Sequence, residues 1–132
     1  MAEEKGLNLD KQASASQAGP QGRNYLLAIA INDYLYCSKL NNAVDDVEAF
    51  IALMKSRYNF EEANITFIKN GEATKKRIEN EFFKLTKKLT AQDNLIVYFS
   101  GHGRYDEDFG GNWVPVDAGS TDDDWPDYLS ND

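Results

Sequence analysis

The only histidine of the chain, His102, lies where a strongly apolar segment ends. The run Leu95-Ile96-Val97-Tyr98-Phe99 leads into Ser100-Gly101, and Gly103 follows the histidine directly. A buried strand that stops in this way delivers a polar side chain to the rim of a sheet. A neutral imidazole there can accept and return protons near physiological pH, so His102 is a candidate general base and acid. The alternative is a structural histidine with no role beyond its own hydrogen bonds.

Other residues could also take part in chemistry, and each has a purely structural explanation. Cys37, the only cysteine, could be a nucleophile, although lone cysteines are commonly inert packing residues. Asp45 and Asp46 stand where acidic side chains stabilise the start of a helix. The run Asp122-Asp123-Asp124 could bind calcium, although such runs are usually only solvated.

Hydrophobic patterning predicts the strands that must position these residues. Runs at 25–31, 65–68 and 95–99 predict three strands. The first is typical of a strand buried on both faces, the second is short, and the third is apolar throughout. The second run is closed by an Asn70-Gly71 turn. From Arg104 onward we expect mainly loop, with a turn at Gly110-Gly111-Asn112 and a short extended piece at 113–116.

Two helices are expected between these strands. Apolar residues at helical spacing cover 42–57, and Asn42 is the N-cap candidate. Thr74 can cap a second helix whose apolar stripe comprises Ile78, Phe82, Leu85 and Leu89. Strands that alternate with amphipathic helices predict an α/β fold with a mostly parallel sheet covered on both faces, and sites at the carboxyl ends of its strands.

The sheet is expected to be incomplete in this chain. The run 95–99 is apolar throughout, so it should be an interior strand with neighbours on both sides. No further long apolar strand follows it, and an open strand edge is unfavourable in an isolated domain. We therefore expect more polypeptide to complete the sheet, on a second chain or in a removed C-terminal part.

Length and charge exclude several functional classes. The 132 residues suffice for one domain, read as a flexible leader at 1–22 followed by part of a domain at 23–132. Residues 1–103 hold 13 acidic and 13 basic side chains, whereas the rest hold 9 acids and only Arg104, which accounts for the net charge of −8. Nucleic-acid binding is not expected from such a balance. No membrane span or signal peptide is expected, and the single cysteine fits a reducing, cytoplasmic location.

Three segments resemble the caspase/metacaspase superfamily of cysteine peptidases, in its bacterial caspase-like type. Tyr98-Phe99-Ser100-Gly101-His102-Gly103 is similar to the family's histidine motif at the end of the third strand. Leu40-Asn41-Asn42-Ala43-Val44-Asp45-Asp46 is similar to the segment that opens the first helix. Trp113-Val114-Pro115-Val116-Asp117 resembles the extended piece after the histidine loop. The resemblance spans residues 24–132 and implies a caspase-like fold.

The resemblance also implies roles for single residues. The family consists of endopeptidases with a Cys–His dyad, so His102 would be the general base and acid, and the backbone N–H of Gly103 would help bind the oxyanion. Asp46 and Ser100 match positions that line the primary specificity pocket. The nucleophilic cysteine would lie beyond residue 132, so the chain alone is expected to be inactive. No cofactor is expected, although some metacaspases bind calcium.

Specificity is a separate question. Caspases that cleave after aspartate use an arginine where Leu40 stands here, and leucine cannot pair with a carboxylate. Asp46 could instead pair with a basic side chain, which favours protein or peptide substrates with Arg or Lys before the scissile bond (P1). Ala43 departs from the eukaryotic pattern, which often has a cysteine there.

Two other functions stay open on the sequence. One is an inactive pseudo-protease or regulatory subunit that retains the fold to bind a partner. The other is an unrelated doubly wound module, similar to a receiver domain, that binds Mg²⁺ through Asp33, Asp45 and Asp46. The second leaves the Ser-Gly-His-Gly motif unexplained.

Overall fold

The computed structural model describes residues 22–108 and 110–130. The predicted leader at 1–22 lies outside this part, apart from Gly22. No helix in the described ranges is long and apolar enough to cross a membrane.

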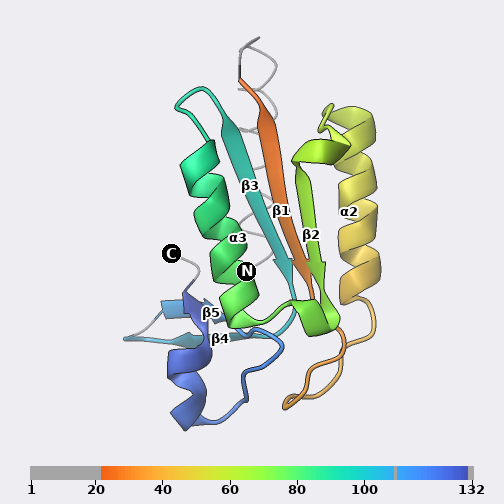
Figure 1. The fold of residues 1–132 in the computed structure, drawn as a ribbon. Coiled ribbons are helices and arrows are strands. Elements are labelled where there is room, and N and C mark those ends of the chain that lie inside the picture. Colours follow the sequence, from red (N-terminus) through yellow and green to blue (C-terminus); the bar gives the residue numbers. More distant parts are fainter. Residues whose placement is uncertain (1–21, 109, 131–132) are drawn as a thin grey trace.

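A three-stranded parallel sheet forms the centre of the fold (Figure 1). Its strands are β1 (Asn24–Ala30), β2 (Ile65–Lys69) and β3 (Asn94–Ser100), in the order β2-β1-β3. The three predicted strands are therefore confirmed to within one residue at each end. β1 is buried almost along its whole length because it lies in the middle of the sheet with a helix on each face. This position explains its continuous apolar run.

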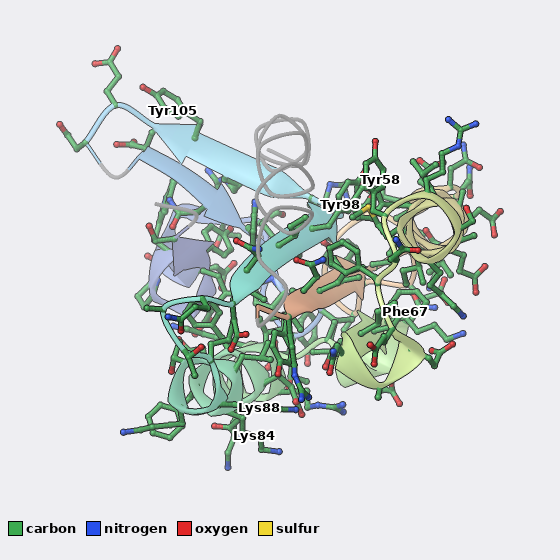
Figure 2. All side chains as sticks on the ribbon, turned by 90° about the horizontal axis from the view of Figure 1, so that it is seen from above. Tyr58, Phe67, Lys84, Lys88, Tyr98 and Tyr105 are labelled. Atoms are coloured by element: carbon green, nitrogen blue, oxygen red, sulfur yellow. The ribbon has the colours of Figure 1, made fainter. Side chains whose placement is uncertain are left out.

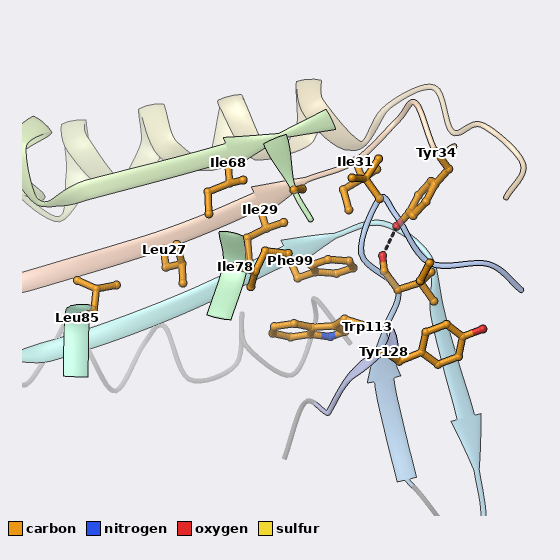
Figure 3. Packing of buried hydrophobic residues seen from close by; sticks show 14 of the residues in the cluster. Leu27, Ile29, Ile31, Tyr34, Ile68, Ile78, Leu85, Phe99, Trp113 and Tyr128 are labelled. Atoms are coloured by element: carbon orange, nitrogen blue, oxygen red, sulfur yellow. Dashed lines mark hydrogen bonds between the residues drawn. The ribbon is translucent and has the colours of Figure 1, made fainter. Parts of the chain in front are cut away.

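The two helices cover opposite faces of this sheet, as predicted for an α/β fold (Figures 1 and 2). On one face, α2 (Ala43–Arg57) packs Val47 and Met54 against Leu26 and Ala28 of β1. On the other, α3 (Lys75–Lys88) packs Ile78 and Leu85 against the alternate residues Leu27 and Ile29. Figure 3 shows the packing on the α3 face.

The predicted N-cap is confirmed for α3, whereas α2 is capped by a different residue from the predicted one. The Thr74 hydroxyl accepts a hydrogen bond from the Arg77 backbone N–H at 3.1 Å, as predicted. Asn42 precedes α2, but its side chain makes no capping bond. The cap comes from Asn32 at the end of β1, whose Oδ1 accepts from the Ala43 N–H at 2.8 Å. Short 3₁₀ helices, Glu62–Asn64 and Asn70–Glu72, flank β2.

The prediction that the chain is mainly loop after Arg104 is wrong. A second sheet lies below the carboxyl ends of the parallel strands (Figure 1) and comprises β4 (Gly103–Asp106), β5 (Gly110–Trp113) and β6 (Leu129–Ser130). The expected turn at 110–112 is thus part of β5, and 3₁₀ helix η3 (Asp122–Asp127) precedes β6. These strands have two to four residues and are rich in glycine and charge, so local preference does not predict them. Long-range pairing and the stacking of Trp113 on Phe99, 4.8 Å between ring centroids, hold them in place.

The edge of β3 that faces away from β1 has no partner strand within residues 22–108 and 110–130. The structure therefore agrees with the expectation of an open edge at this strand, and the interior strand of the described sheet is β1.

Candidate active site

Loops far apart in the sequence meet at the carboxyl edge of the parallel sheet. The chain leaves β3 at Ser100, and the Ile31 N–H after β1 donates to the Ser100 carbonyl at 3.0 Å. His102 therefore faces the loop that connects β1 to α2, and the chain after β5 lies against the same loop, since the Leu35 N–H donates to the Val116 carbonyl.

A main-chain carbonyl holds the imidazole of His102. The ring Nε2 lies 2.7 Å from the Ser38 carbonyl oxygen. A carbonyl can only accept, so this contact requires the proton on Nε2 and leaves Nδ1 as the basic nitrogen of the neutral ring. One side of the ring packs against Tyr34, with 4.7 Å between centroids. The arrangement suits a general base with a defined tautomer.

The backbone of His102 is held on both sides. Its N–H donates to the Tyr34 hydroxyl at 2.8 Å, and its carbonyl accepts from the Val114 N–H at 3.0 Å. The Tyr34 hydroxyl in turn donates to the Val114 carbonyl at 2.8 Å (Figure 3). Burial raises the pKa of the Tyr34 phenol, so the group stays neutral.

Sequence reasoning missed both Tyr34 and Ser38. Ser38 acts through its carbonyl, which every residue has, so its identity carries no signal. Gly101 gives an indirect signal for Tyr34: a Cβ at this position would lie 2.5 Å from the Tyr34 hydroxyl oxygen, so glycine is the residue that leaves the hydroxyl in place.

The exposed Gly103 opens β4 opposite Trp113. Because the Val114 N–H bonds to the His102 carbonyl, the next pair along this antiparallel ladder is one without mutual hydrogen bonds. The Gly103 N–H therefore points away from β5, and the absence of a side chain leaves room for an approaching group.

Asp46 and Ser100 share the α2 face of the sheet. Side chains alternate along a strand, so Ser100 is on the same face as Tyr98, which stacks on Phe50 of α2 at 4.1 Å. Figure 2 shows Tyr98 on this side, opposite Lys84 and Lys88 of α3. Burial, and secondly the negative charge of Asp46, raise the pKa of the Tyr98 phenol. The exposed Asp46 carboxylate is thus close enough to influence Tyr98, two residues before the end of β3.

Cys37 lies one residue before Ser38, and its Sγ is directed to the Ala118 carbonyl at 3.5 Å. Burial raises the pKa of this thiol, and nearby Asp124 raises it further. Both effects disfavour the reactive thiolate. The geometry favours the packing interpretation of Cys37 over the nucleophilic one.

Arg104 is the only basic residue after position 103, and it contacts several residues of the acidic segment that follows it. Arg104 donates to the carbonyl of Ser120 at 2.8 Å and to the Tyr128 hydroxyl at 3.1 Å, and its guanidinium lies 5.2 Å from the Trp125 ring centroid. Asp124 accepts from the backbone N–H of Thr121, which lowers the pKa of the carboxyl. Within the described ranges no three His, Cys, Asp or Glu side chains form a group that could hold a metal ion.

The chain is similar to known proteins over most of its length. Residues 23–131 match the family model of the caspase domain. Metacaspase-1 of Eremothecium gossypii is 27% identical over 97 residues, which cover 69% of this chain and 22% of that relative. The matched part of the chain thus spans about a fifth of the length of the metacaspase.

Proposed function

Because this chain belongs to the caspase-domain family of peptidases, we propose that it forms the histidine-bearing part of a cysteine endopeptidase. One observation carries the proposal: the imidazole of His102 lies at the carboxyl edge of the sheet with Nε2 bound to the Ser38 carbonyl and Nδ1 left as the base. The nucleophilic cysteine would come from the C-terminal remainder of the domain, which would be a second chain or a segment that stays bound after it is cleaved from this chain.

The proposed reaction uses His102 twice. Nδ1 takes the proton from the cysteine thiol, and the thiolate attacks the carbonyl carbon of the scissile amide. The oxyanion that forms is bound by the Gly103 N–H, which points away from β5. The imidazolium then protonates the leaving amine as the C–N bond breaks, and a water activated by the same ring hydrolyses the thioester.

Asp46 and Ser100 are proposed to contribute to the pocket for the side chain before the scissile bond. The negative charge of Asp46 suits an Arg or Lys side chain, and no basic residue stands at position 40, where Leu40 is found. The expected substrates are therefore proteins or peptides cleaved after Arg or Lys.

The partner is proposed to cover two neighbouring surfaces. One is the free edge of β3, which offers unpaired backbone groups to a further strand. The other is an apolar groove of about 590 Å³ beside α3. Its lining includes the side chains of Leu27, Ile29, Phe82, Phe83, Val97, Trp113 and Leu129. A segment that adds a strand to β3 and packs a helix into the groove would bury both.

The test uses the full-length gene product and fluorogenic peptide amides with Arg, Lys or Asp before the cleaved bond. His102→Ala should lower kcat/KM by about 10³-fold or more, because it removes both the base and the acid. The matched control is Lys84→Ala on the surface of α3, which should cleave normally. Unchanged cleavage in the His102 variant would refute the proposal. An unsubstituted protein that cleaves no substrate would favour a regulatory, non-catalytic role instead.

A further inference from the structure

One step beyond the antiparallel ladder between β4 and β5, a side chain is inserted between the backbones of His102 and Val114. In such a ladder, a hydrogen-bonded pair exchanges two bonds, N–H to carbonyl in each direction. At His102 and Val114 only one of them forms, from the Val114 N–H to the His102 carbonyl at 3.0 Å. The Tyr34 hydroxyl takes the place of the other, since it accepts from the His102 N–H and donates to the Val114 carbonyl, both at 2.8 Å.

The inserted hydroxyl is rigidly placed. Tyr34 is 3% exposed and belongs to the core cluster on the α3 face, which includes Phe99 and Trp113 (Figure 3). Its hydroxyl is also the atom nearest to a Cβ built on Gly101, at 2.5 Å. The backbone before His102 thus passes so close to the hydroxyl that a Cβ at position 101 would force one of them to move.

We infer that Tyr34 is a positioning residue for His102: its hydroxyl holds the two strands apart at this pair and thereby sets the direction of the imidazole toward Ser38. The catalytic meaning of this inference rests on the proposed function, whereas the positioning itself does not. Without the hydroxyl, the His102 N–H and the Val114 carbonyl would either pair directly or remain unpaired. Both outcomes shift the His102 backbone, and a shift of about 1 Å is enough to disturb a catalytic group.

The variant Tyr34→Phe isolates the hydroxyl because it keeps the ring that packs against the imidazole. We expect amide exchange at His102 to accelerate at least tenfold in the full-length protein. We also expect the ¹⁵N signals of the histidine ring, assigned by their absence in His102→Gln, to lose the preference for the Nε2–H tautomer. With peptide amides, kcat should fall at least tenfold while KM changes less than threefold. The matched control is Tyr25→Phe, a buried tyrosine at the opposite end of the same sheet.

A second variant, Gly101→Ala, also tests the role of the Tyr34 hydroxyl. Its Cβ should displace the hydroxyl and reproduce the ring-signal change, and the double variant should add little to either single one. Unchanged exchange and ring signals in Tyr34→Phe would overturn the inference, whatever the activity. If that variant does not fold, rapid exchange of the His102 amide in the unsubstituted protein would overturn it equally. Altered ring signals in a protein that cleaves nothing would support the positioning and count against the proposed function alone.

Discussion

His102 is oriented by a main-chain carbonyl, whereas the histidine of a Ser-His-Asp triad is oriented by a carboxylate. A carbonyl fixes the tautomer in the same way but brings no negative charge to stabilise the imidazolium. A serine nucleophile needs that assistance more than a cysteine does, because a thiol ionises near pH 8.5 and is intrinsically nucleophilic. The geometry around His102 is thus better matched to a thiol than to a hydroxyl.

We expect the negative charge of Asp46 to favour substrates with a basic side chain before the scissile bond. Replacement by Asn removes the negative charge and keeps the shape, so cleavage after Arg should fall by about 10- to 100-fold in kcat/KM, as expected for a lost charge-assisted contact of about 1.5–3 kcal/mol. The measurement compares peptide amides with Arg and with Gln at that position, since only the charged substrate should be affected.

Asp45→Asn is the matched control for this prediction. The neighbouring carboxylate is also exposed at the start of α2, so it shares any effect on helix stability. If both variants lose the same fraction of activity, the role of Asp46 in specificity is contradicted.

Among the elements of the fold, Asn32 connects three at the carboxyl edge of the parallel sheet. Its side-chain oxygen caps α2, its backbone carbonyl accepts from the Leu40 N–H at 2.9 Å, and its N–H donates to Oδ1 of Asn70 beyond β2 at 2.8 Å. The loop that presents the Ser38 carbonyl is therefore closed at its base by these bonds.

Asn32→Ala should lower the free energy of unfolding by about 1–2 kcal/mol, because the first N–H groups of α2 lose their acceptor. Asn42→Ala should change it by less than about 0.5 kcal/mol, since the Asn42 side chain makes no capping bond. Urea unfolding measures both. Equal losses would show that the cap is assigned to the wrong asparagine.

The regular elements differ in how far the sequence predicts them. Strands β1 to β3 and both helices follow from apolar periodicity, which is a local property of the chain. Phe82 was expected in the buried stripe of α3, yet it is 45% exposed, because the neighbouring surface is an open groove. Strands β4 to β6 depend on long-range pairing and on the stacking of Trp113 on Phe99, and short segments such as Gly103–Asp106 carry no pattern of their own.

In the whole molecule, the helices cover the two faces of the sheet to different extents. The α2 face carries a packed helix along the sheet, whereas the α3 face retains the apolar groove next to the free edge of β3. An apolar groove beside an unpaired strand is typical of an interface.

Phe82→Glu tests whether this groove is covered in the full-length protein. A charge forced into a covered groove should lower the free energy of unfolding by about 2–3 kcal/mol or more. Leu53→Glu is the matched control, because Leu53 is 40% exposed on α2 and lies outside the groove. Urea unfolding with equally small effects of both substitutions would contradict a covered groove.

The parallel α/β layout and the place of His102 directly after an apolar strand can be predicted from the sequence, because both depend on patterns between near neighbours. The residues that surround this histidine can be identified only from the tertiary structure. Tyr34 and Ser38 precede it by 68 and 64 residues and act through a hydroxyl and a main-chain carbonyl. Such contacts leave no periodic trace along the chain, since they form only when separate loops meet at one edge of the sheet.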